Sequence, residues 1–385
     1  MGRSPDVVVV GGGVIGASVA YHLARAGAKV LLLERDTAGS GASGAAAGML
    51  APLAEAEGPG PFLDLALQSL REYPALAETL RSESGVDPEF VRSGLLRLAF
   101  SDEEAETLKR QAEHLAAAGH DARWLSANDA RELEPGLSPN VVGAILTLQE
   151  GHVRSPRLVT ALLQSAQQYG TTACERREVL DLLRDGGRVV GVATTSGDLS
   201  CGHVVLCAGA WTGLLAERTG LPPVPITPVR GQMAVLRSPS AAPRRILMSA
   251  FGYVVGKTDG TVLVGATMEH AGFDCRVTPW GMSRMLEALN RMAPGLESAD
   301  FQQGWAGLRP GTADGLPLMG PFAGISGLTL CSGHYRNGVL LSPATGRLVA
   351  QLITTGEVPP ELYPFSPDRC SGGASDPRPA GAGTT

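Results

Sequence analysis

The chain has 385 residues, which is long enough for about two or three domains. Hydrophobic residues make up 44% and charged residues 18% of it, a globular balance that argues against a chain disordered throughout. Its net charge of −6 argues against a nucleic-acid partner, because phosphate binding requires a basic surface.

The cysteines and the first apolar stretch restrict the class further. Six cysteines are scattered without a CxxC pair, so we expect no disulfide framework, no metal site and a reducing cytoplasm. The 18 residues from Val7 to Ala24 carry no Asp, Glu, Lys or Arg, as a membrane span would. They contain several glycines and His22, however, so we expect neither a span nor a signal peptide.

The beginning of the chain has the pattern of a βαβ unit. Val7 to Val10 form a β-branched run that ends at three glycines, and a helical pattern follows from Val14 to Ala26. A second apolar run covers residues 29–33. This order of strand, glycine turn, helix and strand is typical of a parallel sheet.

Further elements alternate along the chain. Capping signals predict helices over 101–119, from Ser155 to about 170, and from Thr278 to before Pro294. Strand character appears at 94–100, 188–195, 204–207, 232–236, 253–255, 261–264 and 328–331. The class is therefore α/β with an antiparallel part, and residues 366–385, rich in Pro, Gly, Ser and Ala, are expected to form a disordered tail.

The glycine turn fits a dinucleotide-binding site. Gly11, Gly13 and Gly16 match GxGxxG directly after a strand, where glycines allow a tight turn and close approach to a pyrophosphate. Glu34 follows 18 residues after Gly16, at the end of the second strand, where its carboxylate can accept hydrogen bonds from a ribose. The alternative is a glycine-rich turn in an unrelated α/β fold.

A second run of small residues favours FAD over NAD. Between Thr37 and Ala51 nearly every residue is Gly, Ala or Ser, which cannot build a core but lets backbone lie flat against a large ligand. FAD must be held along its ribityl chain and isoalloxazine ring as well as at adenosine. A flexible linker is the other interpretation of this composition.

These motifs resemble the D-amino-acid oxidase superfamily of FAD enzymes. The resemblance lies in GGGVIG with Glu34, in AGMLAP at 47–52 and in VVLCAGAW at 204–211. WAGLRPGTADG at 305–315 and GHYRNGVLLSPATG at 333–346 are similar to the glycine oxidase branch, whose members supply an imine for thiamine synthesis. The similarity covers residues 5–364 in consistent order.

The resemblance implies a Rossmann-type FAD-binding domain and a second, mainly antiparallel substrate domain. The first would combine residues 1–88, 150–222 and 305–365, and the second residues 89–149 and 223–304. The implied cofactor contacts are Gly11, Gly13, Val14, Ile15, Gly16, Glu34, Arg35, Ala42, Ser43, Ala47, Gly48, Met49, Val179, Ala208, Gly209, His334, Tyr335, Arg336, Asn337, Gly338, Val339 and Leu340. No cysteine stands near Asp314 or Gly315, so we expect FAD to be bound without a covalent link.

Four residues are candidates for substrate binding. A guanidinium forms two parallel hydrogen bonds to a carboxylate, and the resemblance assigns this role to Arg309 on its crowded Gly-Leu-Arg-Pro-Gly turn. It makes Arg336 a second cation, Tyr253 a hydroxyl donor to the same carboxylate, and Met268 a wall that favours small substrates. The alternative interpretations are that both arginines are solvated surface residues and that Tyr253 and Met268 are ordinary core residues.

Two further expectations concern His334 and Lys257. His334 fits a loop histidine, and we assign it no proton transfer. The family often has Pro-Arg where this chain has Gly256 and Lys257, which predicts a looser turn.

The predicted activity is oxidation of a small amino acid by FAD and molecular oxygen. Glycine, sarcosine and small D-amino acids are the candidate substrates, and the products would be an oxo acid, ammonia and hydrogen peroxide. The alternatives are a D-amino-acid or sarcosine dehydrogenase that passes electrons to a quinone or carrier, a flavin-binding module without turnover, and an NAD-dependent dehydrogenase. The resemblance also implies a homo-oligomer, specifically a tetramer.

Overall fold

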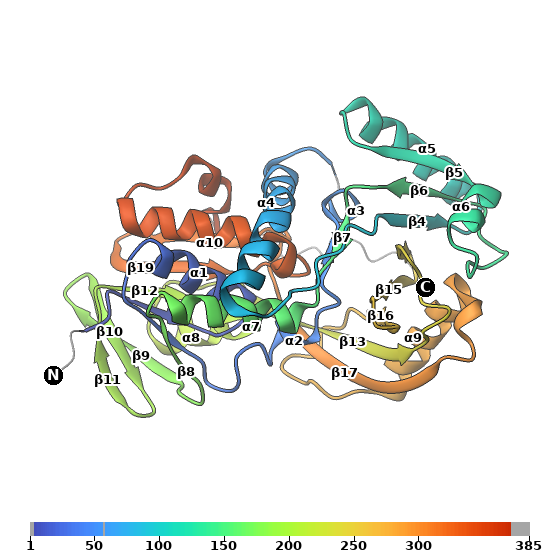
Figure 1. Cartoon of the computed structure of the whole chain (residues 1–385). Coiled ribbons are helices and arrows are strands. Elements are labelled where there is room, and N and C mark those ends of the chain that lie inside the picture. The colour runs from blue at the N-terminus through green and yellow to red at the C-terminus, as the bar shows by residue number, and fades with distance from the viewer. Residues whose placement is uncertain (1–3, 57, 371–385) are drawn as a thin grey trace.

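The computed structural model describes residues 4–56 and 58–370, which form two sheets with their helices (Figure 1). A nine-stranded sheet and its helices occupy the left half of Figure 1, and an eight-stranded sheet occupies the right half. The expected fold class, an α/β Rossmann-type part beside a mainly antiparallel sheet, is confirmed.

The centre of the first sheet is parallel. Its strands run in the order β19 (Ile325–Ser332), β12 (His203–Leu206), β1 (Val7–Val10), β2 (Val30–Leu33) and β8 (Thr172–Cys174). β10 (Arg188–Thr194) pairs with β19 in parallel, and antiparallel pairs add β9 (Val179–Asp185) and β11 (Gly197–Ser200) to β10 and β18 (Leu318–Phe322) to β19. The central strands are short apolar runs because both of their faces are covered.

Alternate residues of β1 enter two different cores. Val7 and Val9 pack with α1 (Val14–Arg25), α4 (Pro61–Ser84), α7 (Ser155–Gln168) and α10 (Gly338–Thr355). Val8 and Val10 pack on the other face against α8 (Thr212–Arg218). The predicted βαβ unit is therefore present, with its helix ending one residue before the predicted Ala26.

The second sheet is antiparallel except where β14 pairs with β4. Its order is β17 (Asp300–Gly311), β13 (Thr227–Arg237), β16 (Thr261–Gly265), β15 (Gly252–Gly256), β14 (Ile246–Ser249), β4 (Leu95–Ala99), β6 (Gly143–Thr147) and β5 (Ala122–Ser126). The helices α5 (Asp102–Ala117), α6 (Ala127–Leu133) and α9 (Pro279–Met292) pack against this sheet. Shorter elements join the halves: α2 (Ala42–Ala45), β3 (Met49–Leu50), α3 (Pro52–Glu55) and β7 (Gly151–His152).

The predicted helix start at Ser155 is confirmed: Ser155 is the first residue of α7, and its hydroxyl donates to the carbonyl of Ser43. The boundary proposed between residues 304 and 305 stays a prediction; these residues lie within β17, which pairs with β13 along its length. The predicted tail begins too early, because Pro367–Cys370 forms a 3-10 turn in which Arg369 binds the Asp314 carboxylate; residues 371–385 lie outside the described residues.

Within the described ranges, no helix combines the length and the apolar character needed to cross a membrane.

The crossing of α1 and α10 depends on Gly346. A Cβ at this position would overlap the Ser18 hydroxyl and lie 2.7 Å from both the Ser18 carbonyl oxygen and Nδ1 of His22. Since one of these atoms is backbone, a side-chain rotation cannot relieve the contact.

We expect Gly346→Ala to lower the free energy of unfolding by about 1–3 kcal/mol through overpacking. Helix propensity alone predicts the opposite sign, a gain of about 1 kcal/mol for an interior glycine. Urea unfolding followed by circular dichroism measures the difference. An unchanged or increased free energy of unfolding would contradict this prediction and show that α1 and α10 can shift to accommodate the methyl group.

Candidate functional site

A cavity of about 990 Å³ is lined by residues from both sheets. At one end lie the carboxyl ends of β1 and β2, and at the other lie β13, β15 and β17 of the second sheet. In open α/β sheets, ligands bind outside the carboxyl ends of the parallel strands. The cavity is therefore the candidate site of this fold.

The structure brings nearly all predicted site residues to this cavity. All four substrate candidates line it: Arg309, Arg336, Tyr253 and Met268. So do the predicted cofactor residues Gly11, Gly13, Val14, Ile15, Glu34, Arg35, Ala42, Ser43, Ala47, Gly48, Met49, Val179, Ala208, Gly209, His334, Tyr335, Asn337, Gly338 and Val339. Gly16 and Leu340 are not among its lining residues. Gly16 packs instead against Gly11, and Leu340 is buried in the helical core.

The glycine turn is fixed by close backbone packing. Gly11 has φ +109°, and a Cβ there would overlap the Cys207 carbonyl oxygen. A Cβ at Gly16 would overlap the carbonyl oxygen of Gly11. These two contacts exclude side chains and bring the first turn of α1, with its N–H groups that lack helical partners, to the wall of the cavity.

The carboxylate of Glu34 is held at the end of β2 by backbone donors. The N–H of Gly12 donates to Oε2 at 2.7 Å, and the N–H of Asp36 donates to Oε1 at 2.9 Å. Beside it, the guanidinium of Arg35 lies 3.8 Å from the ring centroid of Trp211. This end of the cavity thus offers a fixed carboxylate and a flat cation–π pair.

The run of small residues is tied down by contacts from distant elements. Ser155 donates to the Ser43 carbonyl at 2.6 Å, and Trp305 donates to the Ala45 carbonyl at 3.2 Å. The hydroxyl of Ser43 accepts the Val14 N–H at 2.9 Å, at the start of α1. The run is therefore a structured wall of the cavity and no flexible linker.

Lys257 corrects the prediction of a loose turn after β15. The side chain is buried, and its Nζ donates to the carbonyl oxygens of Ala47 and Val153 at 2.9 Å each and lies 3.2 Å from Nδ1 of His152. Burial, with the nearby charge of Arg154, lowers the pKa of Lys257 to about 7. The turn is thus anchored to the small-residue wall.

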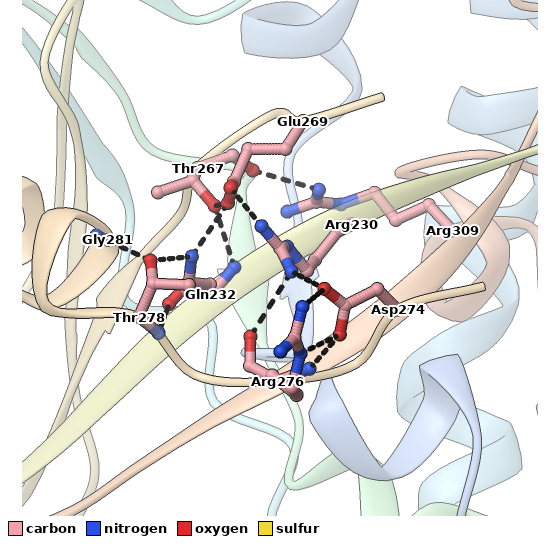
Figure 2. Close-up of polar contacts among 9 residues, drawn as sticks. All are labelled: Arg230, Gln232, Thr267, Glu269, Asp274, Arg276, Thr278, Gly281 and Arg309. Atoms are coloured by element: carbon pink, nitrogen blue, oxygen red, sulfur yellow. Dashed lines mark hydrogen bonds and ion pairs between the residues drawn. The ribbon is translucent and has the colours of Figure 1, made fainter. Parts of the chain in front are cut away.

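Arg309 of β17 is a charged residue of the cavity wall. Its guanidinium packs over Gly231, where a Cβ would overlap it, and its Nη1 donates to the Thr267 carbonyl at 3.1 Å (Figure 2). Within residues 4–56 and 58–370, no carboxylate forms an ion pair with Arg309. A partly buried positive charge therefore faces the cavity without a protein counter-charge.

The hydroxyl of Tyr253 lies near the same group. Burial raises the pKa of Tyr253, and the positive charges of Arg309 and Arg336 offset this only in part. The phenol therefore keeps its proton and can donate a hydrogen bond; in this structure it contacts Sδ of Met233 at 3.2 Å.

Arg336 differs from Arg309 because its charge is compensated. Its Nη2 donates to the Glu55 carboxylate at 2.9 Å, and the Glu55 side chain is only 9% exposed. Met268 lies beside it, with Sδ 3.3 Å from the Tyr335 hydroxyl. The ion pair between Arg336 and Glu55 closes one side of the cavity, between α3 and the segment before α10.

The His334 imidazole is uncharged at neutral pH. The imidazole is fully buried beside the Thr345 hydroxyl at 3.2 Å, and burial lowers its pKa to about 3. The expectation that it is a loop histidine agrees with this environment.

Glu55 and Glu150 are functional residues that the sequence analysis missed. Helix α3 has no side-chain N-cap of its own, and Glu150 takes that place by accepting the N–H groups of Leu53 and Ala54 at 2.8 and 3.1 Å. Its other oxygen accepts the Thr147 hydroxyl at 2.5 Å. Glu150 thereby fixes the helix that presents Glu55 to Arg336, over a sequence separation that no local pattern reveals.

Comparison with known proteins gives a consistent family. The model of the FAD dependent oxidoreductase family matches residues 6–352. The glycine oxidase of Geobacillus kaustophilus is 39% identical over 94% of this chain and 96% of its own length, and the crystal structure of a glycine oxidase from that organism has a TM-score of 0.90 over 94% of this chain and 98% of that one. A Synechocystis protein named Bifunctional protein ThiO/ThiG is 35% identical over 96% of this chain and 54% of its own length.

We expect the stability of the protein to fall between about pH 4.5 and pH 7 through Glu150. Burial raises the pKa of Glu150 from 4.5 to about 7, so in this range the folded protein holds a proton that the unfolded chain releases. The loss amounts to about 3 kcal/mol across the window and is complete above pH 7.

Glu150→Gln keeps an oxygen for Leu53 and Ala54 and removes the titration. Melting temperatures measured against pH should therefore show a flatter profile for this variant than for the wild type. The exposed Glu113→Gln is the matched control and should follow the wild type. Parallel profiles for Glu150→Gln and the wild type would contradict the assignment.

Proposed function

Because this chain belongs to the FAD dependent oxidoreductase family, we propose that it is an amino acid oxidase that deaminates glycine and other small amines, including sarcosine and small D-amino acids. Its product imine would serve thiazole formation in thiamine synthesis. The observation that carries the proposal is the guanidinium of Arg309, which faces the cavity without a carboxylate partner among the described residues.

The cavity fits FAD. It extends from the fixed carboxylate of Glu34, suited to ribose hydroxyls, past the glycine turn, suited to a pyrophosphate, to the small-residue wall at 42–49. Gly11 and Gly48 line the cavity at positions where any side chain would collide with backbone, so only glycine fits there. We assign the ring end of the cofactor to the wall formed by Ala47, Gly48 and Met49.

When bound, FAD supplies the acceptor for the hydride that leaves Cα of the amino acid. Arg309 binds the substrate carboxylate through two of its N–H groups, and the Tyr253 hydroxyl donates to the same carboxylate. Met268 limits the space for a substrate side chain. Water then converts the imine into an oxo acid and ammonia, a step for which we assign no acid or base of the protein.

Arg336 contributes less charge than its position in the motif implies. Its ion pair with Glu55 offsets the guanidinium, so we propose that it bounds the substrate space rather than forming a second full cation there. The uncompensated charge that recognises the carboxylate then belongs to Arg309.

The proposal is tested with a substrate panel and peroxide detection. Glycine should yield glyoxylate, ammonia and hydrogen peroxide in equal amounts, with sarcosine and D-alanine as comparisons. Turnover that requires an added dye or quinone would favour the dehydrogenase alternative. Failure of glycine to bleach the flavin without oxygen would exclude turnover of this substrate.

We expect Arg309→Ala to retain FAD and to lose about 2–5 kcal/mol of substrate affinity, because a bound carboxylate is left without its charge partner. Arg309→Lys keeps the positive charge but not the two parallel donors, so its substrate affinity should lie between those of the wild type and Arg309→Ala. The dissociation constant of acetate, measured from the flavin spectrum, and the KM of glycine report the change. Arg284→Ala, an exposed arginine of α9, is the control. Unchanged constants in Arg309→Ala would refute its role.

We further expect FAD to be released into the supernatant when the protein is precipitated with acid, because we propose non-covalent binding. Absorbance of the supernatant and of the pellet near the flavin maximum measures the distribution. A yellow pellet would indicate a covalent link to the chain.

We also propose that the protein is a homo-oligomer, a tetramer by resemblance, and that it is cytoplasmic. Light scattering tests the oligomeric state, and cell fractionation tests the location.

A further inference from the structure

The segment between β16 and α9, residues 266–278, carries two groups of the site but has no helix or extended strand of its own. Thr267 presents its carbonyl to Arg309, and Met268 lines the cavity. A short backbone bridge to β13 and several side-chain contacts with neighbouring elements hold it in position. Figure 2 shows these contacts gathered around Arg230.

Arg230 of β13 is the buried centre of this arrangement. Its side chain is 8% exposed, and its two terminal nitrogens donate to different carboxylates: Nη2 to Glu269 at 2.6 Å and Nη1 to Asp274 at 2.9 Å. Both carboxylates belong to the segment. Backbone hydrogen bonds between Arg230 and Glu269 add a short antiparallel bridge.

Glu269 links this ion-pair cluster to Thr267. Its Oε1 accepts the Thr267 hydroxyl at 2.5 Å and Nε2 of Gln232 at 2.9 Å. The Thr267 hydroxyl in turn accepts the Gln232 N–H at 2.9 Å, so it is held from two sides. Burial would raise the pKa of Glu269, but hydrogen bonds from Arg230, Thr267 and Gln232 hold it below its ordinary value, and the group is ionised.

The Thr267 carbonyl accepts a hydrogen bond from Nη1 of Arg309 at 3.1 Å. Gly231 provides a flat surface beneath the guanidinium but no directional contact. The orientation of Arg309 therefore depends on where Thr267 is held.

We propose that Glu269 is a positioning residue for substrate binding: through the Thr267 hydroxyl and carbonyl it sets the orientation of the Arg309 guanidinium. The inference rests on the proposed function of Arg309 as the carboxylate-binding group. Glu269 itself does not line the cavity, so it acts through Thr267 and not by contact with a ligand.

The holoenzyme variants Glu269→Gln and Thr267→Val test this. The first removes the charge opposite Arg230, and the second removes the hydroxyl that joins Glu269 to Thr267. Each should raise the acetate dissociation constant, measured from the flavin spectrum, and the glycine KM about ten-fold, since small misplacements of a positioning group weaken binding strongly. FAD content and kcat at saturating glycine should change less than about two-fold, because neither residue lines the cavity.

Two control variants separate positioning from general destabilisation. Thr267→Ser keeps the hydroxyl and should restore acetate binding. Glu134→Gln removes one partner of another buried ion pair, Glu134 with Arg245, in the same half of the molecule and outside the cavity lining. It should lower the melting temperature and leave acetate binding unchanged.

Acetate and glycine constants within two-fold of the wild type in both test variants would overturn the inference. If Glu269→Gln does not fold, Thr267→Val against Thr267→Ser decides alone. The comparison with Arg309→Ala distinguishes two failures. If Arg309→Ala weakens acetate binding and the two test variants do not, only the positioning role fails; if Arg309→Ala also has no effect, the proposed function of Arg309 fails.

Discussion

The positive charge of Arg309 at the cavity wall has a backbone carbonyl as its polar partner and no carboxylate among the residues described. Two other arginines nearby have carboxylate partners: Arg230 forms ion pairs with Glu269 and Asp274, and Arg336 forms one with Glu55. A desolvated charge is costly unless it is paired, and here the missing partner can be supplied by a ligand. The local charge balance is thus consistent with the proposal that a ligand carboxylate binds at Arg309.

Buried polar groups hold the segments of the site that lack regular structure. Lys257 binds carbonyl oxygens on the small-residue wall, Glu150 caps α3, and Glu269 fixes the segment after β16. Lys257 and Glu150 reach these groups from distant parts of the sequence, whereas Glu269 lies within its own segment. In each case an ionisable side chain satisfies backbone or hydroxyl groups that lie outside regular helix or sheet hydrogen bonding.

The sequence predicted the elements whose signals are local. The βαβ unit follows from the β-branched run and its three glycines, and the motif around Arg309 placed that residue at the cavity. It did not predict the partners of the site residues, because Glu55 and Arg336 are 281 positions apart and Lys257 reaches Ala47 over 210. Gly16 and Leu340 belong to the predicted motifs but do not line the cavity. A motif groups residues by their spacing, whereas packing decides which of them face the cavity.

The continuity of β17 constrains how the molecule can move. This strand pairs with β13 from Asp300 to Gly311, carries Arg309, and is joined to the wall at 42–49 through Trp305. A hinge between the two halves at this point would have to break ladder hydrogen bonds and that indole contact together. Displacement of an exposed cavity side chain such as Met268 would open the cavity and leave both of these contacts intact.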